Sequence, residues 1–267
     1  MTVDIFANHA HVFPRECRPE GSIEALLKLM DACQIKRAVA FAPFIDEVHD
    51  LGIDPNEWLA RELEKHNSIC GFGTIDLSKS DPARQAEAIA NLGFKGVKLH
   101  PAYQRFNILA DKLLDFYAAA EGLGLILCFH LGVHWHRIKD YHPLLCDELA
   151  YFYPNLKFTM EHVGGLSFFL DALAVLTNNL RTGNIYAGIT SVLNTNQNLL
   201  WYLGPERMEL LASLIGSSHM IFGLDFPYNG VAEVQEAIDV IQELELTAED
   251  KAKILGGNLA RLLDGSD

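Results

Sequence analysis

Short apolar runs rich in β-branched and aromatic residues alternate with longer amphipathic runs from one end of the chain to the other. Runs of the first kind are typical of buried parallel strands, whereas the longer runs repeat their apolar positions every three to four residues, as helices do. The pattern predicts strands at residues 3–11, 37–43, 69–76, 96–100, 125–130, 157–162, 184–191 and 219–225. It predicts helices at residues 22–33, 55–66, 82–92, 109–122, 140–152, 165–178, 205–215 and 231–244.

Capping residues support several of these helix boundaries. Ser22 stands at the start of the first predicted helix, and Asp54 and Asp81 each stand directly before a proline. A short polar side chain followed by proline is typical of a helix N-terminus, because the proline takes a position whose N–H needs no partner within the helix. Gly93 and Gly122 follow or close predicted helices, and we expect each of them to end its helix.

Eight strands, each followed by a helix, predict an α/β fold of the (β/α)₈ TIM-barrel type. A doubly wound sheet is the alternative, but it rarely needs eight strictly alternating units. The chain has 267 residues, which suits one barrel of roughly 250 residues. The segment 247–250 starts one or two short C-terminal helices, and no linker interrupts the series. We therefore expect one domain over residues 1–267.

Composition excludes several classes of protein. The chain has 35 acidic and 21 basic side chains, a net charge of −14, and 49% apolar residues. An acidic chain is not expected to bind nucleic acid or an anionic membrane, and the longest apolar run, residues 122–132, is shorter than the roughly 20 residues of a membrane span. The five cysteines form no C-x-x-C pair, and the first residues show no leader pattern. These features predict reduced thiols and a cytoplasmic location.

Metal-binding residue types end most of the predicted strands. The strand ends carry His9 and His11, Lys98 and His100, His130, His162 and Asp225. In a TIM barrel the carboxyl ends of the strands form the active-site face. Residues i and i+2 of a strand point to one face about 6.6 Å apart, so His9 and His11 are expected to project together into the barrel mouth.

These residues are consistent with one metal centre. His9, His11, His130 and Asp225 make a set of three imidazoles and one carboxylate, with a coordination position left for water or substrate. His162 is placed to act on that water. A single strand histidine is more often a packed residue than a ligand, but the joint occurrence at separate strand ends favours a metal site.

Motifs across nearly the whole chain resemble the amidohydrolase superfamily, specifically the amidohydrolase-related branch that includes aminocarboxymuconate-semialdehyde decarboxylase. The matching pieces are the His9–His11 pair, the segment 93–101, the strand ending at His130, and the segments 153–158, 161–165, 221–227 and 257–263. Two positions depart from the branch. An acidic residue usually precedes the histidine pair, where this chain has Ala7, and a serine usually precedes the last aspartate, where it has Leu224.

The resemblance implies a divalent metal bound by His9, His11, His130 and Asp225, with His162 polarising the bound water. One Zn²⁺ is the first expectation for an imidazole-rich site, and Mn²⁺, Co²⁺ and Fe²⁺ also suit these ligands. Zinc can bring the pKa of its water to about 7, and Asp225 can accept the proton released.

Lys98 has two interpretations. Other branches of the superfamily carry a carboxylated lysine on this strand that bridges two metals, which would involve Lys98 and His162. We favour instead a contact of Lys98 with a substrate carboxylate, aided by His100, because lysine binds anions as a point charge.

The loop after the fifth strand and one residue beyond the fourth supply further substrate-binding candidates. Trp135 is expected to form an apolar wall, and Arg137 or Arg105 to bind a substrate carboxylate. Thr190, Ser191 and Tyr228 lie close to strand ends and are candidates for the rim, while Trp201 is assigned to the core.

The leading functional hypothesis is a metal-dependent hydrolase whose metal-activated hydroxide attacks an amide, lactone or ester of a small carboxylated molecule. The alternative is a metal-dependent, non-oxidative decarboxylase that uses the same residues. A non-catalytic barrel that serves as a binding scaffold is disfavoured because all five core positions of the site are filled. A homo-oligomer is compatible with the sequence, but no segment identifies an interface.

Overall fold

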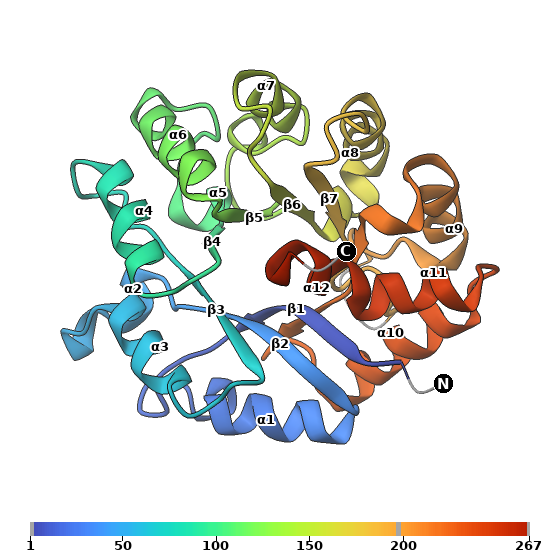
Figure 1. Ribbon diagram of the computed structural model, residues 1–267, viewed down its shortest axis with the longest axis horizontal. Coiled ribbons are helices and arrows are strands. Elements are labelled where there is room, and N and C mark those ends of the chain that lie inside the picture. Colours follow the sequence, from blue (N-terminus) through green and yellow to red (C-terminus); the bar gives the residue numbers. More distant parts are fainter. Residues whose placement is uncertain (1–2, 196–198, 266–267) are drawn as a thin grey trace.

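The computed structural model describes residues 3–195 and 199–265, and its strands form a ring surrounded by helices (Figure 1). The strands are β1 (Ile5–His11), β2 (Ile35–Phe41), β3 (Ile69–Gly73), β4 (Gly96–Leu99), β5 (Ile126–His130), β6 (Phe158–Glu161), β7 (Ile185–Gly188), β8 (Met220–Ile221) and β9 (Gly223–Phe226). All the strand pairs are parallel. The predicted TIM barrel is confirmed.

The eighth predicted strand is divided into two, and this division closes the ring. β8 pairs with β7, whereas β9 pairs with β1, so the sheet order runs from β8 through β7 and down to β1 and then β9. Phe222 lies between the two halves, and its N–H donates to the carbonyl of Ile254 in the C-terminal segment. The last strand therefore changes partner from one neighbour to the other within the length of a single predicted strand.

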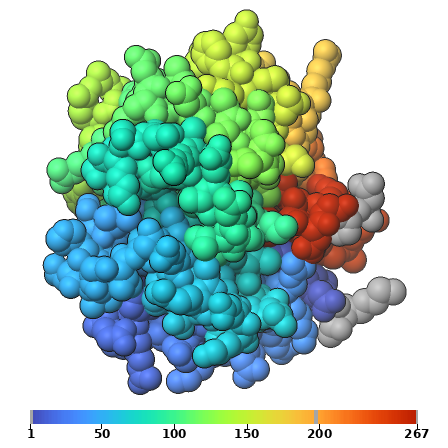
Figure 2. All heavy atoms as spheres, turned by 60° about the vertical axis from the view of Figure 1, so that its left-hand side comes forward, coloured from blue at the N-terminus to red at the C-terminus, as the bar shows by residue number. Residues whose placement is uncertain are grey.

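Most of the helices cover the outside of the ring. The α-helices are α1 (Ile23–Ala32), α2 (Ile45–Val48), α3 (Pro55–Leu63), α4 (Pro82–Asn91), α5 (Pro101–Gln104), α6 (Leu114–Leu123), α7 (Leu145–Phe152), α8 (Gly165–Asn178), α9 (Gly204–Ile215), α10 (Val231–Glu243), α11 (Ala248–Ala252) and α12 (Asn258–Asp264). Short 3₁₀ turns separate some of them, and a π-helical turn at Lys253–Gly257 joins α11 to α12. Figure 2 shows residues of the first half of the chain, coloured blue to green, covering one side of the molecule.

The three helix starts predicted from capping residues are confirmed, whereas the helices predicted from residues 109 and 140 begin at Leu114 and Leu145. Ser22, Asp54 and Asp81 are N-caps whose side chains accept backbone N–H groups of the first turn. Gly93 follows α4 with a φ of 81°, as expected of a helix stop. Gly122 does not end its helix, however, because α6 continues to Leu123. The next glycine, Gly124, adopts the left-handed conformation (φ 68°), and its N–H bonds to carbonyls of the last turn.

The helix α12 closes one end of the barrel and lies at the centre of the ring in Figure 1. Its Leu259, Leu262 and Leu263 pack in one cluster with Phe6 and other residues from the interior of the strands, such as Val39, Phe72, Ile126 and Tyr186. Several of these residues begin their strands, so α12 fills the amino-terminal end. Within the described part of the chain, none of the helices has the length and apolar character needed to cross a lipid bilayer.

Candidate metal centre

The polar residues predicted for the site meet at the carboxyl ends of the strands, opposite α12. His9 lies in β1, His130 ends β5, His162 follows β6, and Asp225 lies in β9. All four are nearly or completely buried, with at most 7% of each exposed. Residues separated by as much as 216 positions in sequence therefore converge on one point of the barrel axis.

Three of these residues have a left-handed backbone conformation, which sets the direction of their side chains. His9, His162 and Asp225 have φ values of 68°, 63° and 54°, and Ser191 has 54°. A residue with a Cβ held in a sparsely populated region costs about 1–3 kcal/mol, and such residues cluster at functional sites. The strain at this face of the barrel is therefore concentrated on the candidate site.

The strand pleat at His9 differs from the prediction. Ala7 pairs with Ala38 and Ala10 with Ala40, so three steps along β1 match two along β2. Such a bulge re-aims the side chain that it carries. His9 and His11 thus reach the same region with ring centroids 5.1 Å apart, but the bulge and not a regular two-residue period brings them there.

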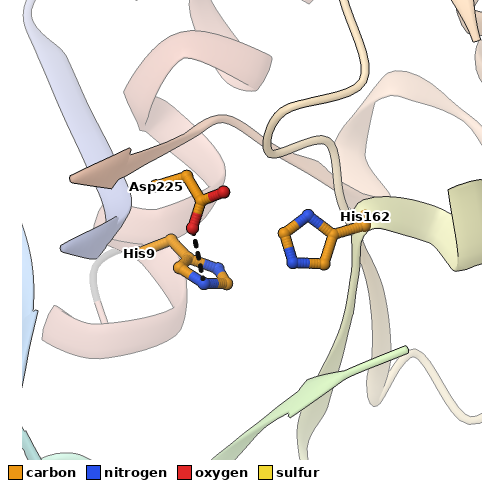
Figure 3. A group of neighbouring side chains, drawn as sticks. All are labelled: His9, His162 and Asp225. Atoms are coloured by element: carbon orange, nitrogen blue, oxygen red, sulfur yellow. Dashed lines mark ion pairs between the residues drawn. The ribbon is translucent and has the colours of Figure 1, made fainter. Parts of the chain in front are cut away.

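The donor atoms of His9, His162 and Asp225 all lie within 4.8 Å of one another. Figure 3 shows His9 and Asp225 side by side, with the ring of His162 opposite them. The Nε2 atom of His9 is 3.5 Å from Oδ1 of Asp225, and the other carboxylate oxygen, Oδ2, accepts a hydrogen bond from the Ser191 hydroxyl at 2.6 Å. Ser191 thus orients the carboxylate.

The outer nitrogen of each central imidazole is bound to an acceptor. His9 Nδ1 lies 2.8 Å from a carboxylate oxygen of Glu161. His162 Nδ1 lies 2.9 Å from the carbonyl of Thr190, and His130 Nε2 lies 3.1 Å from the carbonyl of Gly132. Because these oxygens can only accept, we assign an N–H to each outer nitrogen, and the inner nitrogen of each neutral ring is left as a lone-pair donor.

The inner nitrogens fit a metal ion. His130 Nδ1 and His162 Nε2 are only 3.0 Å apart, and by this assignment neither carries a proton that could join them. Two ligand atoms of one tetrahedral zinc ion lie about 3.3 Å apart. A cation bound between the two lone pairs would therefore remove the repulsion between these unprotonated nitrogens. Metal-binding histidines commonly donate their other N–H to a carboxylate or carbonyl, as these three do.

Burial keeps the imidazoles neutral and the carboxylate basic. Burial, followed by the charge of Lys98, lowers the pKa of His9 well below its ordinary value, and burial also lowers the pKa of His11 and His130. The pKa of His162 falls to about 4, mainly through burial. Burial raises the pKa of Asp225 to about 6, against the lowering effect of its hydrogen bond from Ser191. Neutral imidazole is the form that binds metals.

Glu161 is a site residue that the sequence analysis missed. It is fully buried, and its carboxylate accepts hydrogen bonds from five groups: Asn8 Nδ2, Thr159 Oγ1, Cys128 Sγ, Thr190 Oγ1 and His9 Nδ1. Gly188 leaves the space for it, since a Cβ there would stand 2.4 Å from the carboxyl carbon. β6 thus supplies the acidic anchor for His9 that Ala7 cannot provide. A glutamate inside a buried strand, directly before His162, was the available clue.

Lys98 lies beneath the centre. Its side chain is fully buried, its Nζ is 3.1 Å from His9 Nε2, and the same atom is 4.9 Å from the centroid of the Phe41 ring. The Lys98 ammonium can only donate, so it reaches the same inner lone pair of His9 that a metal would take, and Lys98 is not among the described residues that line the cavity above the site.

A cavity of about 520 Å³ opens above the centre. His100 is part of its wall and stacks on His130 with ring centroids 3.7 Å apart. The described residues that line the cavity are His11, Phe44, Glu47, His100, Tyr103, His130, Val133, His134, Trp135, Leu200, Trp201, Asp225 and Tyr228.

Of the remaining residues predicted to contact the substrate, only some line the cavity. Trp135 lines the mouth of the cavity and is 96% exposed. Arg105 and Arg137 are exposed and are not among the described lining residues, and Arg137 lies 3.4 Å from Asp140. Trp201, which the sequence analysis assigned to the core, is part of the cavity wall, with its ring centroid 4.3 Å from that of His162.

Solved structures with the same fold include enzymes that act on aromatic acids. A 5-carboxyvanillate decarboxylase from Sphingomonas paucimobilis is 17% identical with a TM-score of 0.73, over 98% of this chain and 99% of that one. A dihydroxybenzoic acid decarboxylase from a Polaromonas species, with bound manganese and an inhibitor, is 15% identical with a TM-score of 0.73, over 98% and 97% of the two chains. A protein from Pseudomonas putida provisionally assigned as 2-pyrone-4,6-dicarboxylic acid hydrolase is 17% identical with a TM-score of 0.73, over 99% and 98%.

The family is shown by the sequence match itself. The family model described as Amidohydrolase (Amidohydro_2) matches residues 9–265, from the first candidate ligand to the residue that follows α12. The predicted resemblance is thereby confirmed over nearly the whole chain. The chain belongs to the amidohydrolase family.

Proposed function

We propose that the chain is a metal-dependent hydrolase whose divalent ion is held by His9, His11, His130 and Asp225, with His162 beside it. The observation that carries the proposal is the inward orientation of the buried, neutral imidazoles of His9, His130 and His162, with the donor atoms of His9 and His162 close to the Asp225 carboxylate. His11 lines the cavity above them, and among the described residues its ring nitrogens have no hydrogen-bond partner. A divalent ion in such a site polarises substrate oxygens and acidifies water, and zinc is our first candidate.

The protein residues divide the remaining work. Asp225 presents Oδ1 toward His9 while Ser191 holds Oδ2, so the carboxylate is fixed and ready to accept a proton from water. Its pKa of about 6 leaves it ionised at neutral pH yet basic enough to act. His162 is oriented by the Thr190 carbonyl and stabilises charge or returns the proton to the leaving group.

Non-oxidative decarboxylation is the second candidate reaction, and the composition of the cavity wall favours it. Phe44, Tyr103 and Trp201 provide flat walls for an aromatic acid, and two of the structural neighbours are decarboxylases of aromatic acids. In this reaction the carboxylate of the substrate would lie near the ion, and Asp225, once it has taken a proton from water, would pass it to the ring carbon as the bond from that carbon to the departing CO₂ breaks.

One experiment separates the two reactions. The protein, loaded with Zn²⁺ or Mn²⁺, is incubated in ¹⁸O-labelled water with aromatic and unsaturated acids and with amides, esters and lactones. Hydrolysis places ¹⁸O in the product acid, whereas decarboxylation releases CO₂ and leaves the product unlabelled. Asp225→Asn should lose either activity, and His49→Ala, which changes an exposed histidine outside the site, should keep it. Turnover retained in Asp225→Asn would contradict both proposals.

We also propose a cytoplasmic location and small-molecule substrates for the enzyme. All five cysteines are free thiols, which is in keeping with the reducing cytoplasm. We expect small-molecule substrates, because the cavity holds about 520 Å³, and a homo-oligomer remains compatible with the sequence.

A further inference from the structure

A group of exposed apolar side chains lies beside the mouth of the cavity, and we call it the apolar rim. Its members come from the loop after β5, the segment before α7, the first two turns of α8 and the segment before α9. Their exposed fractions range from 44% to 96%. The apolar rim consists of Trp135, Leu144, Leu166, Leu170, Leu199 and Leu200.

Contacts between these segments make the apolar rim continuous along one side of the mouth. Trp135 and Leu200 both line the cavity. The indole N–H of Trp201 donates to the carbonyl of Val133 at 3.3 Å, which joins the segment before α9 to the loop after β5. A Cβ on Gly165 would stand 2.9 Å from the carbonyl oxygen of Leu200, so the same segment also lies against the start of α8.

The segment before α7 adjoins the same part of α8. The helices α7 and α8 lie next to each other on the outside of the ring (Figure 1). The ring of His142 lies 4.9 Å from the ring of Phe168, and its Nε2 is 3.3 Å from a carboxylate oxygen of Asp171. Leu144 follows His142 by two residues, and Leu170 directly precedes Asp171. The apolar rim therefore extends from the mouth of the cavity across α8 to the start of α7.

The apolar area of the rim matches one side of a stable protein interface. Its side chains together expose the equivalent of about four whole side chains, which is on the order of 600 Å² at ~150 Å² for each. A standard interface buries about 800 Å² on each partner, and somewhat more than half of that area is apolar. Monomeric proteins rarely expose a contiguous apolar patch of more than a few hundred Å². The area is therefore sufficient for a stable contact with another protein surface.

The charge distribution favours a second copy of this chain as that surface. Residues 131–139, 141–146, 163–170 and 199–205 contain neither aspartate nor glutamate, although the chain has 35 acidic residues and a net charge of −14. The exposed Arg137 and Lys139 add positive charge near Trp135, and Asp171 lies beside His142. Two acidic copies can thus approach over the apolar rim with few carboxylates facing each other.

An anionic membrane fits the same surface less well. Segments that bind anionic lipids typically carry about four to eight lysines and arginines, whereas the loop beside the apolar rim offers Arg137 and Lys139. A net charge of −14 would oppose the approach to such a membrane.

We propose that the apolar rim is the interface of a homodimer with two-fold symmetry, in which the rim of one copy packs against the same rim of its partner. In such an isologous contact the same patch serves both subunits, so apolar area meets apolar area. Because Trp135 and Leu200 line the mouth of the cavity, the partner also covers one side of that mouth. The inference concerns the surface of the molecule and holds for either of the proposed reactions.

Sedimentation velocity of the zinc-loaded protein over a series of concentrations tests the proposal. The wild type should sediment as a dimer at micromolar concentrations. Leu170→Asp should raise the dissociation constant of the dimer about 100-fold, because each of the two copies loses a buried leucine and gains a charge. Leu144→Asp, which changes a different segment of the apolar rim, should act in the same direction.

Leu214→Asp is the matched control. Leu214 is an exposed leucine of α9 outside the apolar rim, so this variant should dissociate as the wild type does. Far-ultraviolet circular dichroism checks that all three variants are folded.

Tryptophan emission reports on the apolar rim directly. Trp135 is 96% exposed in the single chain, so its emission should move to longer wavelength when the dimer is diluted and the indole returns to water. Trp135→Phe keeps an apolar ring, and this variant should remain dimeric while losing most of the shift.

Several results would overturn the proposal. They are a wild type that stays monomeric at high micromolar concentration, a dimer that withstands both Leu170→Asp and Leu144→Asp, and a dimer that Leu214→Asp weakens as strongly as Leu170→Asp does. A monomeric wild type that co-sediments with phosphatidylcholine vesicles would assign the apolar rim to a lipid surface instead.

Discussion

Glu47 should cost the protein stability in a pH-dependent way, because its carboxylate is held partly away from water. Burial raises its pKa from 4.5 to about 7, a difference of about 2.5. At 1.36 kcal/mol per unit, ionised Glu47 destabilises the fold by about 3 kcal/mol. The folded state binds the proton more tightly than the unfolded chain, so stability is greatest below pH 4.5 and is lost as the pH rises through 7.

Glu47→Gln removes this dependence, since glutamine does not ionise. The variant and the wild type should be equally stable near pH 4.5, and at pH 8 the variant should be more stable by about 3 kcal/mol. For a chain of this size, that difference corresponds to roughly 6–12 °C in Tm. Thermal unfolding is followed by circular dichroism at several pH values in the presence of a chelator, so that metal binding does not contribute to the difference.

The exposed neighbour provides the control. Asp46→Asn removes a carboxylate from the same short helix and should change Tm by no more than a degree or two at any pH, as is usual for an exposed position. A difference between Glu47→Gln and the wild type that does not change with pH would refute the argument. So would a wild type that is more stable than the variant at pH 8.

Four further variants address the metal centre and the barrel end. His130→Ala and Asp225→Asn should each abolish turnover and lower the metal content measured by elemental analysis, and full metal and activity in both would show that the site is wrong. Glu161→Gln should weaken metal binding about 10–100-fold, because Glu161 orients His9; unchanged metal affinity would refute that role. Leu259→Ala should lower the free energy of unfolding by about 2–5 kcal/mol while metal content per folded molecule stays constant, and urea unfolding with the same elemental analysis checks both.

The barrel and the location of its active face were predictable from local patterns. Alternation of short apolar runs with amphipathic runs reflects burial on both faces of a strand and on one face of a helix, and both depend on neighbouring residues alone. The capping residues Ser22, Asp54 and Asp81 act within one helical turn, so they too were visible in the sequence. Once the barrel was predicted, the rule that strand ends converge brought His9, His130 and Asp225 to one face.

The orientation and the charge of the site were decided by tertiary contacts. Glu161 bonds to His9 across 152 positions of sequence, and whether it does so depends on a bulge in β1 and on the space left by Gly188. Lys98 is buried beneath the centre and Arg137 is exposed beside Asp140, and neither position could be read from the charge of the residue alone. Strand-end residues identify the chemistry that a barrel has available, but bulges and long-range packing determine which atoms face the substrate.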